Sequence, residues 1–249
     1  MSLVRISNRY LDKITWHSVS SCDFALNRHA DIWRINISEN LPRLDSFSAM
    51  INAAETQRAN RYLQPRDKNR FIISRAALRV ILGKYLNMQP SAVEFETGMN
   101  KKPFLKSSPL RYNVSHSGDW IAIAVSGTDT GIDVESVDHS FHYTDIIGEY
   151  FSPEEAKFIT SDNSCARFFL LWTRKEALTK ATAKGLDDDL RFVPALDGEY
   201  SVKSDLLKST ANWQVASFEL YPDYIAAVAS EVEAETLRFW DVDLSKGSL

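Results

Sequence analysis

The segment RFFLLWTRKEALTKATAKGL, from Arg167 to Leu186, has the pattern of an amphipathic helix with a charged face. Trp172, Glu176 and Lys180 follow one another at steps of four residues, so a helix places them on the same side. Apolar residues at helical spacing anchor it and a glycine marks its expected end: Phe168, Leu171, Leu178 and Gly185. A glutamate and a lysine at this spacing can also form a solvated ion pair that contributes only about 0.3–0.5 kcal/mol.

The same helix gathers further basic residues, Arg174, Lys175 and Lys184, around its single acid. Each lysine taken alone is typical of a solvated surface. Together they indicate a surface that would bind a polyphosphate beside a metal ion and stabilise charge during phosphoryl transfer.

A second acidic site lies upstream in GIDVE, from Gly131 to Glu135, after an expected turn that ends at the glycine. On a strand, residues two apart point to the same face, so Asp133 and Glu135 project together while Ile132 and Val134 face the core. Two carboxylates this close suit Mg²⁺ or Mn²⁺, with phosphate oxygens and water completing the coordination. The alternative is an edge strand with an exposed acidic face, and Glu176 is a candidate third carboxylate.

The segment NVSHSGDW, from Asn113 to Trp120, is interpreted as a turn rich in hydrogen-bond donors. Hydroxyls, backbone amides and the His116 imidazolium could hold a phosphate there. A capping turn, or a nucleophilic serine beside a histidine base, are the alternatives. The chain lacks the GxSxG nucleophile elbow, which argues against a serine hydrolase.

Composition and charge argue against several classes of protein. The net charge of −4 argues against a general nucleic-acid binder, and no apolar run approaches the roughly 20 residues of a membrane helix. Cys22 and Cys165 form no CxxC motif and indicate no disulfide framework. We therefore expect a cytoplasmic protein without membrane or nucleic-acid partners. A basic run between Arg58 and Arg79 is a solvated helix surface by default, or a site for an anionic ligand or acidic protein.

The order of elements predicts an α+β fold built from two similar halves, residues 1–127 and 128–249. In the first half, a strand at Asp31 to Ile37 precedes helices at about 46–63 and 67–86 and strands at 93–97 and 120–126. In the second half, a strand at 132–135 precedes helices at about 144–150, 153–160 and 166–184. Strands at about 213–220, 224–230 and 237–244 then complete it. A weak echo between Arg70-Phe71 and Arg167-Phe168 is consistent with duplication.

Taken in order and at this spacing, KKPFL, NVSHSGDW, GIDVE and WTRKEALTKATAKGL make the chain closely resemble the Sfp-type 4′-phosphopantetheinyl transferases. The resemblance runs from about Trp33 to Val193 and is strongest between Lys101 and Leu186. It implies two α+β halves related by a pseudo-twofold axis, with coenzyme A bound between them. Three departures affect loop geometry and partner preference rather than charged groups: no glycine precedes the lysines of Asn100-Lys101-Lys102-Pro103, Ala183 replaces a glycine, and Leu178 an aromatic residue.

The resemblance also implies roles for individual residues. Carboxylates matching Asp133, Glu135 and Glu176 surround Mg²⁺ on the coenzyme A pyrophosphate, and the residue matching Lys180 neutralises that pyrophosphate. The residues matching His116 and Ser115 contact the 3′-phosphate. Those matching Lys102 and Arg70 lie at the nucleotide end of coenzyme A.

The expected reaction is therefore Mg²⁺-dependent transfer of the 4′-phosphopantetheine arm from coenzyme A to a serine of an apo acyl or peptidyl carrier protein, releasing 3′,5′-ADP. Glu176 would ligate the metal and relay the serine proton, directly or through water. A non-catalytic module that binds coenzyme A or a carrier protein is the main alternative, and a metal-dependent phosphohydrolase is another. Two halves in one chain make a monomer sufficient. Fatty-acid, polyketide, siderophore and other peptide synthesis all remain open as pathways.

Overall fold

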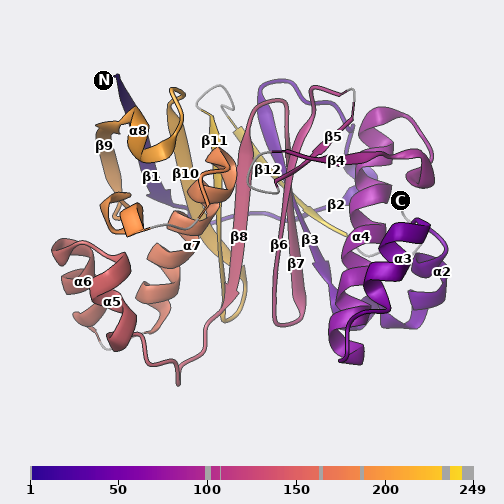
Figure 1. Cartoon of the computed structure of the whole chain (residues 1–249), viewed down its shortest axis with the longest axis horizontal. Coiled ribbons are helices and arrows are strands. Elements are labelled where there is room, and N and C mark those ends of the chain that lie inside the picture. Colours follow the sequence, from indigo (N-terminus) through magenta and orange to yellow (C-terminus); the bar gives the residue numbers. More distant parts are fainter. Residues whose placement is uncertain are drawn as a thin grey trace.

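A computed structural model of the chain describes residues 2–98, 102–106, 108–162, 165–185, 188–231 and 236–242. Two five-stranded sheets pack face to face, and one long helix covers the outer face of each, as Figure 1 shows. The helices are α1 (Ile37–Asn40), α2 (Leu44–Ser48), α3 (Ala53–Ala59), α4 (Pro65–Leu86), α5 (Thr144–Tyr150), α6 (Pro153–Thr160), α7 (Cys165–Thr182) and α8 (Ser204–Leu207). The expected α+β class is confirmed.

The strands of the first sheet run in the order β8-β11-β10-β1-β9, and those of the second in the order β2-β12-β3-β7-β6. A separate two-stranded sheet pairs β4 with β5. Their bounds are β1 Leu3–Tyr10, β2 His17–Ser18, β3 His29–Asn36, β4 Phe95–Thr97, β5 Pro103–Leu105, β6 Arg111–Ser117, β7 Trp120–Ser126, β8 Thr130–Ser136, β9 Gly198–Lys203, β10 Trp213–Tyr221, β11 Tyr224–Glu231 and β12 Thr236–Asp241. Most of the expected strands and helices are present, although the expected helix at 46–63 is divided into α2 and α3.

The two sheets exchange their terminal strands. Strand β1 pairs in parallel with β10, in the sheet built mainly from the second half of the chain. Strand β12 lies between β2 and β3, in the sheet built mainly from the first half. Each of these two strands thus pairs with strands from the other half of the chain. The division into residues 1–127 and 128–249 stays a prediction.

A buried aspartate holds β12 in the sheet of the first half. The side chain of Asp31 on β3 is fully buried and accepts hydrogen bonds from Arg238 (2.7 Å to Nε) and from Trp240 (2.8 Å to Nε1) on β12. Tyr85 at the end of α4 donates a third, short hydrogen bond to it. A buried carboxylate is tolerated only when such partners satisfy it, so losing β12 would leave Asp31 without two of them.

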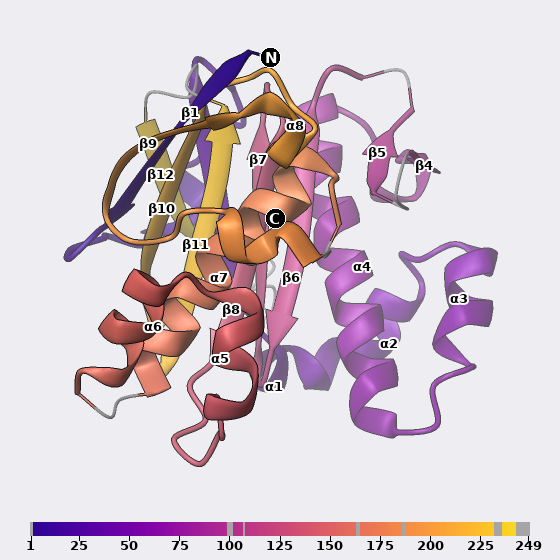
Figure 2. The same ribbon diagram turned by 60° about the vertical axis from the view of Figure 1, so that its left-hand side comes forward.

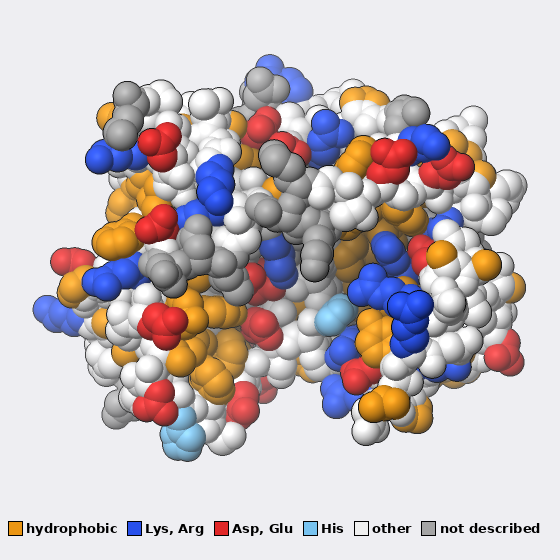
Figure 3. All heavy atoms as spheres, viewed as in Figure 1, with side chains coloured by type: hydrophobic (Ala, Val, Ile, Leu, Met, Phe, Trp, Pro, Cys, Tyr) orange, Lys and Arg blue, Asp and Glu red, His pale blue; other side chains and the backbone are white. Residues whose placement is uncertain are grey.

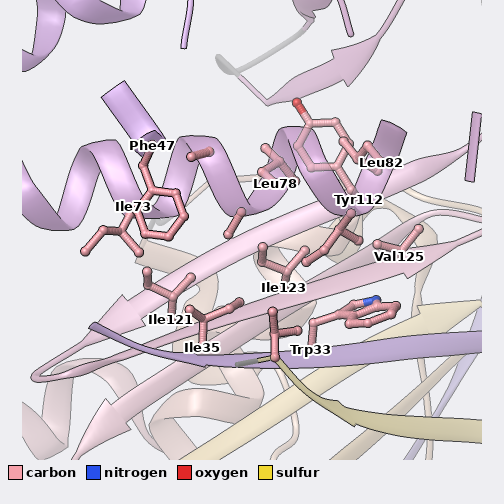
Figure 4. Close-up of a cluster of buried hydrophobic side chains, with 14 of the residues drawn as sticks. Trp33, Ile35, Phe47, Ile73, Leu78, Leu82, Tyr112, Ile121, Ile123 and Val125 are labelled. Carbon is pink, nitrogen blue, oxygen red and sulfur yellow. The ribbon is translucent and has the colours of Figure 1, made fainter. Parts of the chain in front are cut away.

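Alternation along the strands divides the core into layers. On β7, Ile121 and Ile123 face α4, whereas Ala122 and Ala124 face the other sheet. Figure 4 shows the first of these layers, in which side chains of β3, β6 and β7 pack against α4 and Phe47. Because β7 is covered on both faces, it is buried along its whole length. The same alternation on β8 directs Ile132 and Val134 to the core between the sheets, as predicted, and leaves Asp133 and Glu135 on the side of α7.

Helix α7 ends at a position that the sequence did not indicate. Ala183, with φ +54°, adopts the left-handed conformation directly after the helix, two residues before the expected stop at Gly185. The amide of Lys184 donates to the carbonyl of Thr179 (3.2 Å) and that of Ala183 to Lys180 (3.4 Å). This is the Schellman pattern, in which the left-handed residue is usually glycine.

Replacing Ala183 by glycine should therefore stabilise the protein. An L-residue in the left-handed conformation costs about 1 kcal/mol relative to glycine, and we expect most of that to be recovered as a higher free energy of unfolding. Urea unfolding followed by circular dichroism measures it. The control Ala156→Gly, inside helix α6, should lower stability by a similar amount. A destabilised Ala183→Gly variant would contradict the assigned helix end.

Candidate functional site

Strand β8 and helix α7 cross in close contact, and this contact builds the site. A Cβ atom at Gly131 would overlap the backbone carbonyl of Ala177 and the amide of Ala181. Gly131 thus lies inside a strand and not in the turn expected from the sequence, and its missing side chain lets the helix rest on the strand. Figure 1 shows α7 beside β8, with β6 of the other sheet next to it.

Asp133 and Glu135 project from β8 on the side of α7, and each carboxylate is held by a serine of β6. Ser115 donates to Asp133 (2.8 Å to Oδ1), and Ser117 donates to Glu135 (2.9 Å to Oε2). Asn113 completes the series by accepting a hydrogen bond from the backbone amide of Ile132 (2.9 Å). The facing edges of the two sheets are therefore joined through side chains, which explains why carboxylates and serines share the same two-residue spacing.

Lys180 and Glu176 reach the same place from α7. The Lys180 ammonium lies 2.6 Å from Asp133 Oδ1 and 3.1 Å from Ser115 Oγ. Lys180 therefore forms its ion pair with Asp133 on β8, while the expected alternative was a pair with Glu176 within the helix.

Burial, together with the charge of Asp133, raises the pKa of Glu176 to about 7, although Lys180 counteracts part of the effect. The pKa of Asp133 is raised by burial, and that of Glu135 by burial and by the charge of Asp133. The three carboxylates therefore repel one another's charge in a partly dehydrated place. Such a site favours either a shared proton or a cation.

The three carboxylates have the donor chemistry that a divalent cation requires. Asp133 Oδ2 is buried and has no hydrogen-bond partner among the described residues, so one hard oxygen donor is available beside two further carboxylates. Within the described part of the chain, no three His, Cys, Asp or Glu residues are already gathered closely enough to hold a metal ion. The donor chemistry thus fits Mg²⁺ or Mn²⁺. Binding would require the three carboxylates to move closer together and the contact between Lys180 and Asp133 to weaken.

His116 lies on strand β6 and not in a turn, because the hairpin turn consists of Gly118 and Asp119. Alternation along β6 turns His116 away from Ser115 and toward the side of α4, where Arg70 lies. Desolvation by the surrounding protein lowers the pKa of His116, and the positive charges of Arg70 and Lys180 lower it further. Arg70 itself pairs with Asp67 one helical turn before it (2.8 Å). The positive charges of Arg70 and Lys180 thus act on the imidazole, and positive potential of this kind favours an anionic ligand.

Figure 3 shows these surroundings as a hollow between the two halves of the front face. Acidic side chains gather on the side of α7 and β8, and basic side chains with a histidine gather on the side of α4. On that basic side, a cavity of about 480 Å³ is lined by Arg66, Arg70 and the Gly118-Asp119 turn, among others.

Several predicted phosphate-binding cations lie elsewhere. Arg174 is buried and binds Asp197 (2.6 Å), and Lys175 is fully buried and binds Glu155 (2.9 Å). Both side chains stabilise the interior on the far side of α7, so the prediction that they surround Glu176 is wrong. A helix carries side chains on all its faces, and the adjacent positions 174 and 175 point away from the face of 176 and 180.

The remaining predicted ligand is Lys102, just before β5. Its ammonium donates to two backbone carbonyls, those of Ala181 (2.6 Å) and Thr130 (3.2 Å). The neighbouring Lys101 lies outside the described residues. Sequence reasoning counted the Ser117 hydroxyl among the donors of a phosphate-binding turn and missed its contact with Glu135, and it did not single out Gly131 as a site residue. The contact could have been found from the two-residue offset of Ser117 to Ser115, which matches that of Asp133 and Glu135.

Comparisons with known proteins identify the family of the chain. Residues 37–128 match the family model described as "4′-phosphopantetheinyl transferase, N-terminal", and residues 129–229 match the model of the 4′-phosphopantetheinyl transferase superfamily. The 4′-phosphopantetheinyl transferase HetI of Nostoc sp. is 32% identical over 225 residues, covering 86% of this chain and 93% of its own. A putative 4′-phosphopantetheinyl transferase of Synechocystis sp. is 32% identical over 73% of this chain and 77% of its own. The 4′-phosphopantetheinyl transferase Sfp of Bacillus subtilis is 25% identical over 75% and 84%.

Proposed function

The chain belongs to the 4′-phosphopantetheinyl transferase family, and from this premise we propose that it transfers the 4′-phosphopantetheine arm of coenzyme A to a serine of an apo acyl or peptidyl carrier protein. The observation that carries this proposal is the meeting of Asp133, Glu135, Glu176 and Lys180 where β8 crosses α7, at the edge of a hollow with a basic opposite side. Opposite charges placed on the two sides of a hollow suit a ligand that combines phosphates with a bound cation.

In the proposed reaction, the carrier serine oxygen attacks the phosphorus that bears the pantetheine arm. The bond to the 3′,5′-ADP oxygen breaks, a new phosphodiester bond joins the arm to the serine, and 3′,5′-ADP leaves. Glu176 is the proposed acceptor of the serine proton, directly or through water, because a raised pKa makes its carboxylate a stronger base. Lys180, which now pairs with Asp133, would turn to the negative charge that develops on the pyrophosphate.

Asp133, Glu135 and Glu176 are the residues that would hold Mg²⁺ or Mn²⁺. When bound, the ion would supply Lewis-acid stabilisation of the pyrophosphate charge. Ser115 and Ser117 would keep the two β8 carboxylates turned toward α7. His116 and Arg70 are the proposed contacts of the 3′-phosphate at the other side of the hollow.

The carrier protein is proposed to approach from the side of α4. Leu63, in the loop before α4, is 96% exposed, the highest value among the large exposed apolar residues of the described chain. Arg61 and Arg66 beside it in sequence are also exposed. An exposed apolar side chain between exposed basic residues is complementary to a partner surface with an apolar centre and acidic residues around it.

The deciding experiment incubates the protein with coenzyme A, Mg²⁺ and a panel of apo acyl and peptidyl carrier proteins, and weighs each carrier by mass spectrometry. We expect one or more carriers to gain the arm and an equal amount of 3′,5′-ADP to appear. Coenzyme A binding without metal dependence and without transfer would instead indicate a binding module. Phosphate release in the absence of a carrier would indicate a phosphohydrolase.

Metal binding has a separate test that does not depend on activity. A carboxyl group whose pKa is raised to about 7 holds its proton below that pH, so a cation must displace the proton there but not above it. Millimolar Mg²⁺ should therefore raise Tm more at pH 8 than at pH 5.5, as measured by scanning calorimetry. The Asp133→Asn variant should lose this increase. An equal increase in that variant would show that the cation binds elsewhere.

A further inference from the structure

The last turn of helix α7 ends in backbone carbonyls that its own hydrogen bonds do not all satisfy, and the carbonyl of Ala181 is one of them. The Schellman pattern at Ala183 occupies the carbonyls of Thr179 and Lys180. It provides no donor for the carbonyl of Ala181, which belongs to the last turn and is followed by the left-handed residue. A helix end that lacks such a donor tends to fray, and this end immediately follows Lys180.

The donor comes from the other half of the chain. Lys102, before β5, places its ammonium 2.6 Å from the Ala181 oxygen. A cation at the C-terminal end of a helix also interacts favourably with the helix dipole. Burial lowers the pKa of Lys102, with the charges of Asp129 and Glu231 opposing that effect. The two hydrogen bonds to backbone carbonyls thus offset part of the cost of removing the ammonium from water.

The same ammonium holds the strand that carries the acidic residues. Its second hydrogen bond, of 3.2 Å, goes to the carbonyl of Thr130 at the start of β8. Thr130 precedes Gly131, where the strand touches the helix, and Ala181 follows Lys180 directly. One side chain therefore joins the two elements beside their crossing, on the same strand as Asp133.

We propose that Lys102 is a positioning residue, which caps α7 and fastens it to β8 so that Glu176 and Lys180 stay opposite Asp133. This inference deepens the proposed function and rests on it. It differs from the role implied by the family resemblance, in which the matching lysine lies at the nucleotide end of coenzyme A.

A cavity of about 390 Å³ borders Lys102 together with Ala181 and Thr182, so neighbouring atoms do not fill the place of the side chain. Shortening or neutralising the side chain would leave the Ala181 carbonyl facing this cavity. The helix end could then shift, and a displacement of about 1 Å near a reacting group can lower a rate by about 10²-fold.

The test compares Lys102→Met with the control Lys106→Met, whose side chain is 54% exposed and pairs only with surface acids. We expect Lys102→Met to lower kcat by about 10–100-fold with KM for coenzyme A changed less than about 2-fold, because orientation and not binding is lost. Amide hydrogen exchange in residues 178–183 should become faster in Lys102→Met alone. Lys102→Arg, which keeps the charge and several donors, should recover most of kcat and of the protection.

Other outcomes overturn the inference. A raised KM for coenzyme A with unchanged kcat would assign Lys102 to nucleotide binding. Unchanged exchange in α7 would show that the cap is not needed, and a Lys102→Arg variant as impaired as Lys102→Met would rule out capping by a cation. If the wild-type protein transferred no arm to any carrier, the proposed function would fail, whereas the exchange measurement would still test the cap.

Discussion

Replacing Glu176 by glutamine is expected to lower the rate of arm transfer by about three orders of magnitude without unfolding the protein. The amide has nearly the same shape, but it can neither accept the serine proton nor ligate a cation as an anion. Loss of a general base alone typically costs 10²–10⁴-fold, and loss of a metal ligand adds to this. The measurement is kcat with coenzyme A, Mg²⁺ and the best carrier of the panel.

The fold should tolerate this change because the carboxylate is a source of repulsion. Its pKa of about 7 lies above that of an ordinary glutamate, so the folded state binds the proton more tightly than the unfolded state. Stability therefore declines as pH rises from about 4.5 to 7, and Glu176→Gln should lessen that decline. Glu154→Gln, at an exposed position in the first turn of helix α6, is the matched control and should leave the rate unchanged and lower stability by no more than about 0.5 kcal/mol. Wild-type activity in Glu176→Gln would show that the proposed base and metal ligand are wrongly assigned.

Replacing Gly131 by alanine is expected to produce the largest loss of stability. The added methyl group would overlap the Ala177 carbonyl and the Ala181 amide, both of which belong to the backbone of α7. A backbone cannot turn aside as a flexible side chain does, so strand and helix must separate. We expect a cost of about 3 kcal/mol or more, which corresponds to a decrease of Tm of roughly 10 °C for a chain of this size.

Activity should fall further than stability alone explains, because the same separation moves Glu176 and Lys180 away from Asp133. The control is Gly127→Ala, at a glycine whose added Cβ atom would meet nothing within 4 Å. That variant should unfold like the wild type in calorimetry. A Gly131→Ala variant with unchanged Tm would mean that helix and strand are less closely packed than the structure has them.

Periodicity in the sequence predicted the parts of the fold that depend on local pattern. The four-residue steps of Trp172, Glu176 and Lys180 defined α7, and the two-residue step of Asp133 and Glu135 defined the outer side of β8. Both patterns depend only on residues near in sequence, so they predict the helix and the strand without knowledge of the tertiary contacts. The meeting of Glu176 with the β8 carboxylates was expected from the family resemblance, because no local rule relates residues this far apart.

The errors share one cause, which is that tertiary partners lie outside any local window. Arg174 and Lys175 were expected to surround Glu176, but Asp197 and Glu155 bind them in the interior. Gly131 was assigned to a turn, which glycine often marks, although here it permits a helix to approach a strand. Alanine at position 183 normally continues a helix, so the residue itself did not indicate the left-handed conformation; the glycine that the family has at this position was the available signal.

The exchange of terminal strands also dictates when the site can form during synthesis. A nascent chain has made His116 and Ser115 long before it makes β12, which must then enter between β2 and β3 in the same sheet. Until that strand arrives, the sheet lacks an inner member and Asp31 lacks Arg238 and Trp240. The carboxylates of β8 also depend on this sheet, because Ser115 and Ser117 of its strand β6 hold them. The sheet that carries His116 and Ser115 is therefore complete only after β12 has been translated.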